Sequence, residues 1–501
     1  MKIIASFLIP ALMLFSSTDA LIPITVKGKR FIKPNSDAST QGEVFFIKGI
    51  DYQPGGSSGY DSSSGEDALS DPDTCYRDAY AFQQLGINTL RIYSLNPDSN
   101  HDECMTIFNN AGIYLILDVN SGEQGASLNR ADPASSYNSG YLSRVFKFIE
   151  AFKNYPNVLG FFSGNEVIND ESNYAEISPN YIRAVQRDMK QYIAKHSNRT
   201  IPVGYSAADS VTLRRATFEY LQCFIDGDED DSSRSDFFGL NSYEWCSGTS
   251  NWANSGFENL NSTLSNTTLP LFFSEFGCNK NLPRTFDEVS DGLFGGLVNT
   301  FSGGLVYEYT EEPSHYGVVD LNDDGSITYK EDFDNLKNEF ANSSLPTILE
   351  DDVEEADIVT CNADIVTDIY PSFGANFTIP EQPKEIADLI ENGVDTDNVG
   401  KLLDDVEAKK SNYTIYDHSS NEVESATVRF EASNEINTQS GVVVSSKAEP
   451  SSSSSVQAAA STSEESSTAG SSSSSGDGVM NIYVPTYGIW SLIMLVVSYA
   501  I

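Results

Sequence analysis

Two glutamates lie where strongly apolar stretches end, and their carboxyls could carry acid–base or nucleophilic chemistry. Glu166 follows Gly164-Asn165 at the end of one stretch, and Glu275 lies between Ser274 and Phe276 near the end of another. An ionised carboxylate at the buried end of a strand is costly unless it is paired or used. Two structural carboxylates in salt bridges are the alternative interpretation.

A pair of carboxyls that face one sugar linkage would suit retaining glycoside hydrolysis. In that reaction one carboxyl is protonated and releases the leaving sugar, while the other is ionised and attacks the anomeric carbon. Mutual repulsion and unequal burial would separate the pKa values of the two groups. We therefore expect Glu166 and Glu275 to face one site.

Other strand ends carry residues that suit a sugar site, although each taken alone could serve core packing. Arg91 and Tyr243 could donate hydrogen bonds to Glu275, and Asn165 could bind a sugar 2-hydroxyl. Tyrosine rings offer flat apolar faces to pyranose rings. The predicted substrate-binding residues are Gln53, Arg91, Tyr93, Asp118, Asn165, Tyr243 and Tyr307.

The last stretch, Gly303–Thr310, makes a separate prediction about side-chain direction. Side chains alternate along a strand, so Tyr307 and Tyr309 should share one face and Glu308 should take the other. If Tyr307 faces the site, Glu308 should not be catalytic.

Eight apolar stretches rich in β-branched or aromatic residues could position these side chains, because such stretches are typical of parallel strands buried on both faces. Helical patterns lie between them, and Asn180–His196 is the clearest, with Ser178 as a possible cap and Pro179 at the first position. The order predicts a (β/α)8 TIM barrel, an α/β fold with its active site at the carboxyl ends of the strands. A doubly wound open sheet is the alternative, but no glycine-rich phosphate loop follows the first strand. The predicted strands are Val44–Tyr52, Thr89–Ser94, Tyr114–Val119, Leu159–Glu166, Pro202–Ala207, Phe237–Trp245, Leu271–Gly277 and Gly303–Thr310, and the other predicted helices are Cys75–Leu85, Tyr141–Asn154 and Thr285–Asn299.

Both ends of the chain have the character of processing signals. Residues 1–20 resemble a secretory signal peptide, whose apolar run is too short for a membrane anchor. Small residues, a short spacer and the terminal apolar run Gly488–Ile501 predict a glycolipid (GPI) attachment signal with Gly476 as the attachment residue. A plain transmembrane tail is the alternative, although about 14 apolar residues fall short of the roughly 20 that span a bilayer. The predicted organisation is 1–20 signal, 21–345 barrel, 346–440 acidic extension, 441–476 Ser-rich stalk and 477–501 attachment propeptide.

Composition supports an extracellular protein. A formal net charge of −42 disfavours binding to nucleic acid or anionic lipid and is compatible with a neutral polysaccharide. Six cysteines predict three disulfides, for which the sequence alone allows 15 pairings. Asn-x-Ser/Thr glycosylation signals occur at Asn198, Asn261, Asn266, Asn342, Asn376 and Asn412.

One segment matches the residue spacing of a metal site. Residues Asp320–Gly325, with Glu331, fit the spacing of an EF-hand calcium loop. A calcium hand needs helices on both sides, whereas Tyr316–Val319 reads as strand or loop and Asp-Gly is also a hairpin turn. We therefore expect a hairpin here, and no metal or cofactor.

Five stretches carry a resemblance to a known family: Gly160–Glu166 (GFFSGNE), Ile201–Ser206 (IPVGYS), Leu240–Cys246 (LNSYEWC), Phe273–Cys278 (FSEFGC) and Gly303–Tyr309 (GGLVYEY). They resemble the fungal GPI-anchored β-1,3-glucanosyltransferases of glycoside hydrolase family 72. The resemblance runs from about Leu21 to Ser344, and this chain lacks the Cys-rich carbohydrate-binding module of longer members. Phe276 also stands where the family more often has tyrosine, a change that could remove a hydrogen bond near the nucleophile.

The resemblance implies roles for these residues. Glu166 would be the acid/base and Glu275 the nucleophile of an enzyme that cuts β-1,3-glucan and transfers one part to another glucan chain. The implied partners are a glucan donor, a glucan acceptor and a membrane held through the GPI anchor, with no obligate protein partner. A plain endo-β-1,3-glucanase or a catalytically weak wall glycoprotein are the alternatives. The implied disulfides are Cys75–Cys104, Cys223–Cys361 and Cys246–Cys278.

Overall fold

The computed structural model describes residues 21–56 and 60–439 of the chain. The predicted signal peptide 1–20, the stalk 441–476 with Gly476, and the propeptide 477–501 lie outside the described residues. No helix within the described ranges is long and apolar enough to cross a membrane.

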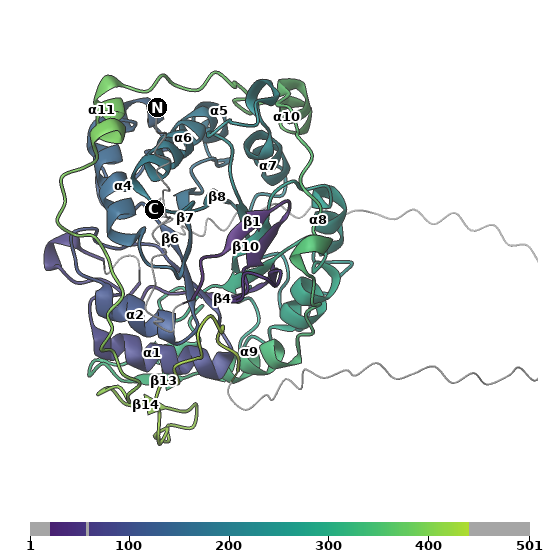
Figure 1. Cartoon of the computed structure of the whole chain (residues 1–501). Helices are drawn as coiled ribbons and strands as arrows, with labels where there is room; N and C mark the ends of the chain where they lie inside the picture. Colours follow the sequence, from purple (N-terminus) through teal and green to yellow (C-terminus); the bar gives the residue numbers. More distant parts are fainter. Residues whose placement is uncertain (1–20, 57–59, 440–501) are drawn as a thin grey trace, which may run out of the picture. The chain divides into compact units, whose positions relative to one another are not determined.

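The core of the fold is a closed barrel of eight strands, each parallel to its neighbours, in the order β10-β11-β4-β5-β6-β7-β8-β9. Helices surround it in Figure 1, which confirms the predicted (β/α)8 barrel and excludes the open sheet. Each observed strand lies within or one residue from its predicted stretch. The strands are β4 Ile47–Asp51, β5 Thr89–Ile92, β6 Tyr114–Asp118, β7 Val158–Asn165, β8 Val203–Ala207, β9 Phe238–Ser242, β10 Leu271–Phe276 and β11 Gly303–Val306.

The helices alternate with the strands, and their ends follow local sequence signals. The Asp71 side chain caps α1 by accepting the backbone N–H groups of Asp73 and Thr74. Pro179 begins α6 as predicted, but Ser178 does not cap it, because its hydroxyl donates to the Arg130 carbonyl at 3.2 Å instead. The helices are α1 Pro72–Leu85, α2 Asp102–Asn110, α3 Pro133–Ser136, α4 Ser139–Phe152, α5 Tyr174–Ile177, α6 Pro179–His196, α7 Arg214–Gln222, α8 Phe257–Leu264, the π-helix η4 Glu288–Gly296 and α9 Glu331–Asn342.

A small antiparallel sheet closes the amino-terminal end of the barrel. It consists of β1 Thr25–Lys27, β2 Arg30–Lys33 and β3 Glu43–Phe45. Phe31 and Phe45 of this sheet join the apolar cluster inside the barrel, which includes Phe162 and Phe272. The polar side chains therefore collect at the opposite, carboxyl-terminal end.

The acidic segment after the barrel is folded against it. Its helices α10 Ala363–Ile369 and α11 Lys384–Asn392 pack on α7 and on α4 and α6, and its strand β14 Ile415–Tyr416 extends the β12–β13 hairpin. Figure 1 shows this green-to-yellow segment running along the outside of the barrel. The sequence left this segment undecided between a helical appendage and disorder, and the structure shows that residues 346–439 are a strap around the barrel.

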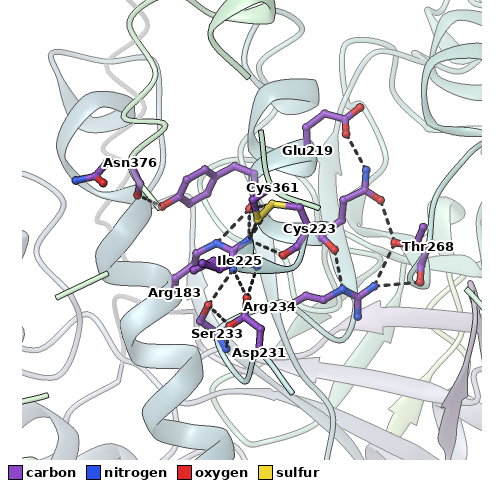
Figure 2. The surroundings of a disulfide bond; sticks show 12 residues. Arg183, Glu219, Cys223, Ile225, Asp231, Ser233, Arg234, Thr268, Cys361 and Asn376 are labelled. Carbon is purple, nitrogen blue, oxygen red and sulfur yellow. Dashed lines mark hydrogen bonds and ion pairs between the residues drawn. A yellow bond between two sulfur atoms is a disulfide. The ribbon is translucent and has the colours of Figure 1, made fainter. Parts of the chain in front are cut away.

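Three disulfides are present, and they are the pairs that the family resemblance implies: Cys75–Cys104, Cys223–Cys361 and Cys246–Cys278. The second ties the strap to α7, and Figure 2 shows its surroundings. Arg183, fully buried on α6, donates to the Cys223 carbonyl at 2.8 Å and pairs with Asp231 at 3.3 Å. The attachment of the strap is thus built on a buried charge pair as well as a covalent bond.

The segment with calcium-loop spacing forms a hairpin. Strands β12 Val319–Leu321 and β13 Ile327–Tyr329 flank it, and Asp324 Oδ1 accepts the backbone N–H of Ser326 at 3.0 Å. A strand therefore stands where an EF-hand needs its first helix. Within 21–56 and 60–439 no cluster of three or more His, Cys, Asp or Glu side chains is arranged to hold a metal ion.

The predicted glycosylation sites differ in exposure. Asn261 is half-buried and its Oδ1 accepts the Thr300 hydroxyl. The other sites are exposed: Asn198, Asn266, Asn342, Asn376 and Asn412.

Candidate active site

Glu275, at the carboxyl end of β10, is held by three donors that come from β5 and from the ends of β5 and β9. Its Oε1 accepts Arg91 Nη1 at 3.1 Å and the Tyr93 hydroxyl at 3.1 Å, and its Oε2 accepts the Tyr243 hydroxyl at 2.7 Å. Burial and neighbouring negative charge raise the pKa values of both phenols, so each keeps the proton that it donates. Both oxygens of Glu275 therefore accept hydrogen bonds from groups that keep their protons.

Arg91 links this carboxylate to a second one. Its guanidinium is fully buried, binds Asp118 through Nε at 2.8 Å and Nη2 at 3.3 Å, and lies between the rings of Tyr93 and Phe162, 4.3 and 4.6 Å from their centroids. A guanidinium held in such a fork keeps its charge and direction. Arg91 thus presents a fixed positive charge to Glu275.

Glu166 lies immediately after β7 and is placed by an uncommon backbone conformation. Its φ is 52°, in the left-handed region that non-glycine residues seldom adopt, and its N–H donates to the Ser206 carbonyl at 2.9 Å. Burial, and next the negative charge of Glu275, raises the pKa of Glu166 to about 7. This carboxyl can therefore hold a proton near neutral pH, unlike an ordinary glutamate.

Beneath Glu166 lies a network of small polar side chains from four neighbouring strands. Asn241 on β9 donates to Glu166 Oε1 at 2.7 Å, and its Oδ1 accepts the Ser274 hydroxyl at 2.9 Å and lies 3.1 Å from the Ser206 hydroxyl. Asn165 accepts the Ser206 hydroxyl at 2.8 Å. The sequence analysis selected Asn165 but missed Asn241, Ser206 and Ser274. Each of the three lies inside a quoted motif, and its inward position at a strand's carboxyl end was the available signal.

The predicted residues divide into an accessible group and a buried group. Tyr307 is half-buried and its ring lies 6.3 Å from that of Tyr243 and 5.2 Å from that of Tyr316, a residue the sequence analysis did not select. Gln53 is buried and exchanges hydrogen bonds with the Ser94 backbone, so its amide joins β4 to the end of β5 rather than contacting either glutamate. The accessible group is Asn165, Glu166, Tyr243 and Tyr307, and the buried group is Gln53, Arg91, Tyr93, Asp118 and Glu275.

The prediction that Tyr307 and Tyr309 share a face is wrong. Tyr309 points to α1, where its hydroxyl donates to Asp78 at 2.7 Å, whereas Tyr307 lies beside Tyr93 and Tyr243. Strand β11 ends at Val306, so the two-residue alternation does not extend to these positions. Glu308 is buried, and burial followed by the charge of Glu312 raises its pKa to about 8.

Phe276 also differs from expectation. Its ring is buried in the apolar core around the barrel, 6.1 Å from the Phe273 ring and against Gly304. The residue at this position therefore packs away from the Glu275 carboxyl.

Asp51 is a further site residue that the sequence did not reveal. It ends β4 opposite Arg91 on β5, is 1% exposed, and both carboxyl oxygens have no hydrogen-bond partner in the structure. Burial raises the pKa of Asp51 well above its usual range. It is thus a neutral acid between the charged groups of the site.

Together these residues form an acid with a pKa near neutrality and an anion held by three donors at the same end of one barrel. That combination suits double displacement at a glycosidic carbon, in which a proton donor and a nucleophile act on one bond.

Comparison with known proteins gives consistent matches. A family model described as "Glucanosyltransferase" matches residues 13–344. "Probable 1,3-beta-glucanosyltransferase GAS3" of Saccharomyces cerevisiae is 62% identical over 447 residues, which cover 87% of this chain and 85% of that protein. "1,3-beta-glucanosyltransferase gel2" of Aspergillus fumigatus is 45% identical over 428 residues, or 85% of this chain and 86% of its own. A solved structure of a mutant Saccharomyces cerevisiae Gas2p, in complex with laminaritetraose and laminaripentaose, superposes with a TM-score of 0.62 at 38% identity, covering 73% of this chain and 75% of that one.

Proposed function

This chain belongs to the glucanosyltransferase family, and from this premise we propose that it remodels β-1,3-glucan of the fungal cell wall by retaining transglycosylation. The enzyme cuts one glucan chain internally and joins the released segment to the non-reducing end of another. The pair formed by Glu166 and Glu275 carries this proposal, because the two carboxyls have opposite surroundings at one end of the barrel.

In the first half of the reaction, Glu275 attacks the anomeric carbon of the donor glucan. Glu166 gives its proton to the glycosidic oxygen as the C–O bond breaks, and the released reducing-end fragment leaves with that proton. The remaining segment is then an ester of Glu275. The three hydrogen bonds from Arg91, Tyr93 and Tyr243 hold the attacking carboxylate in place.

In the second half, Glu166 is ionised and acts as a base. It removes the proton from a hydroxyl of the acceptor glucan. The oxygen of that hydroxyl attacks the anomeric carbon of the ester, and the Glu275 carboxylate leaves. Water could attack instead and would yield plain hydrolysis, so the acceptor decides between transferase and hydrolase. The exposed faces of Tyr243 and Tyr307 offer apolar surfaces for sugar rings, and Asn165 offers an amide for the 2-hydroxyl.

Product analysis on a reduced laminari-oligosaccharide tests this proposal. Products longer than the substrate are expected, and their absence together with shorter products would show an endo-β-1,3-glucanase. If well-folded protein shows no turnover, the remaining hypothesis is a wall glycoprotein that binds glucan or adds structure.

We propose in addition that the mature enzyme is held at the outer face of the plasma membrane by a GPI anchor near Gly476. The support is the sequence of the terminal segments and the six glycosylation signals. Release of the protein from intact cells by a phosphatidylinositol-specific phospholipase is the expected result. Retention after this treatment would favour covalent attachment to the wall or a transmembrane tail.

A further inference from the structure

The carboxyl of Glu166 rests on a side chain whose orientation is fixed from below. Asn241 Nδ2 donates to Glu166 Oε1 at 2.7 Å and approaches Asn165 Oδ1 at 3.3 Å. Its Oδ1 lies 3.1 Å from the Ser206 hydroxyl and 2.9 Å from the Ser274 hydroxyl. Asn241 itself is fully buried, so no solvent competes for these contacts.

The two serines determine which way the Asn241 amide points. An amide oxygen is only an acceptor and an amide nitrogen only a donor. In the reversed orientation, Asn241 Oδ1 would face Asn165 Oδ1 and Glu166 Oε1. Each of these two contacts would then bring two acceptor oxygens together without a proton between them. Each serine hydroxyl has one proton: Ser206 can donate to Asn165 Oδ1 and Ser274 to Asn241 Oδ1, so the observed orientation gives each amide oxygen a donor.

This arrangement distinguishes the two oxygens of the Glu166 carboxyl. An oxygen that already receives an N–H cannot at the same time present a proton toward that N–H. The N–H from Asn241 occupies a lone pair of Oε1 and makes it the less basic of the two oxygens, so a proton on Glu166 is favoured on Oε2. We infer that Asn241, oriented by Ser206 and Ser274, is a positioning residue that places the transferable proton of Glu166 on Oε2 and steadies the carboxylate when it acts as a base.

The inference rests on the proposed function for its catalytic meaning, but its structural part can be measured without activity. A hydrogen bond from Asn241 stabilises the ionised form and lowers the pKa of Glu166, against the upward effects of burial and Glu275. Loss of a hydrogen bond to a charged group corresponds to a pKa rise of about one unit.

The test compares Asn241→Ala and Asn241→Asp in the full secreted chain. An ionised aspartate keeps the volume of asparagine but has no donor. If Asn241 only filled space, Asn241→Asp would therefore behave like the wild type. The carboxyl of Glu166 is followed by carbon-13 NMR of glutamate-labelled protein, with the signal assigned from Glu166→Gln. Its titration midpoint should rise by about one pH unit in Asn241→Ala and further in Asn241→Asp, because the aspartate adds a like charge.

Two further variants make the test specific. Ser274→Ala removes one donor to Asn241 Oδ1 and should shift the midpoint in the same direction by a smaller amount. Asn157→Ala is the matched control, because Asn157 is also fully buried but lies just before β7, at the amino end of the barrel, and donates to the carbonyls of Met105 and Ile113. It should lower stability and leave the midpoint unchanged.

Activity provides the second readout. Asn241→Ala should lower kcat on laminari-oligosaccharides roughly 10- to 100-fold with a small effect on KM, and should move the basic limb of the pH profile upward. An unmoved Glu166 midpoint in both Asn241 variants would overturn the inference. Wild-type protein that titrates as expected but transfers no glucan would instead count against the proposed function alone.

Discussion

Replacing the buried, unpartnered Asp51 by asparagine should change how the stability of the protein depends on pH. Asp51 sits between Arg91 on one side and the carboxyls of Asp118, Glu275 and Glu308 on the others, and no donor reaches either of its oxygens. An ionised carboxylate in such a place would carry the full cost of desolvation, so the folded protein keeps the acid neutral. Asparagine has nearly the same shape and never ionises.

The sign of the effect follows from the direction of the pKa shift. The unfolded chain releases the Asp51 proton above a pKa of about 3.9, whereas the folded protein, with its raised pKa, retains it. The stabilising contribution is thus complete below pH 4 and is lost as the pH rises toward the folded pKa. Once the unfolded chain is fully ionised, and until the folded pKa is reached, the wild type loses about 1.4 kcal/mol per pH unit relative to Asp51→Asn.

Denaturant unfolding of both proteins with intact disulfides, at half-unit steps from pH 4 to pH 8, measures this difference. The free energy of unfolding of Asp51→Asn, minus that of the wild type, should increase with pH. Glu288→Gln is a useful companion, because burial raises the pKa of Glu288 to about 7 and its gain should stop near that pH. A difference for Asp51→Asn that is constant or falls with pH would refute the reasoning, since it would mean that the folded protein holds Asp51 ionised.

Three other outcomes follow from the site and the strap. Glu275→Gln should lower glucan cleavage and transfer at least about 1,000-fold while the melting temperature stays within a few degrees, and full activity in this variant would exclude Glu275 as nucleophile. The value of kcat/KM should fall above about pH 7, where Glu166 loses its acid proton, and a basic limb that persists unchanged in Glu166→Gln would assign it to another group. Joint replacement of Cys223 and Cys361 by alanine opens a loop of 138 residues and should reduce the free energy of unfolding by roughly 3–5 kcal/mol, measured by urea titration. No change in the midpoint would mean that the strap is held by its other contacts.

The sequence was sufficient to predict the barrel because burial on both faces leaves a distinctive pattern. Strands such as Tyr114–Asp118 and Leu271–Phe276 are fully buried, and their continuous apolar runs distinguish them from half-exposed strands. The same pattern located the two glutamates, since a charged residue at the end of such a run is conspicuous. Continuous buried strands, and charged residues that are costly to bury at their ends, were therefore reliable signals for the fold and for the site.

The other parts of the site and of the fold depend on three-dimensional contacts that a linear sequence pattern does not contain. Asn241 and Asp51 become recognisable only when the closed barrel brings the end of β9 within reach of Glu166, across β8, and Arg91 turns toward Asp118 instead of Asp51. The direction of Tyr309 depends on where β11 stops, and strand ends are the least certain part of any prediction from sequence. The strap contains only short elements, among them α10, α11 and the two-residue strand β14, so most of its residues have no periodic pattern to recognise.

The roles of the two glutamates are coupled by charge. The donors Arg91, Tyr93 and Tyr243 bind the Glu275 carboxylate, and the negative charge of that carboxylate is the second largest cause of the raised pKa of Glu166. An arrangement that prepares the nucleophile therefore also prepares the acid. When Glu275 becomes an ester its charge disappears, the pKa of Glu166 falls, and the same carboxyl becomes a better-populated base for the second half of the reaction. The change in the role of Glu166 follows from the chemistry at Glu275 and needs no movement of the barrel.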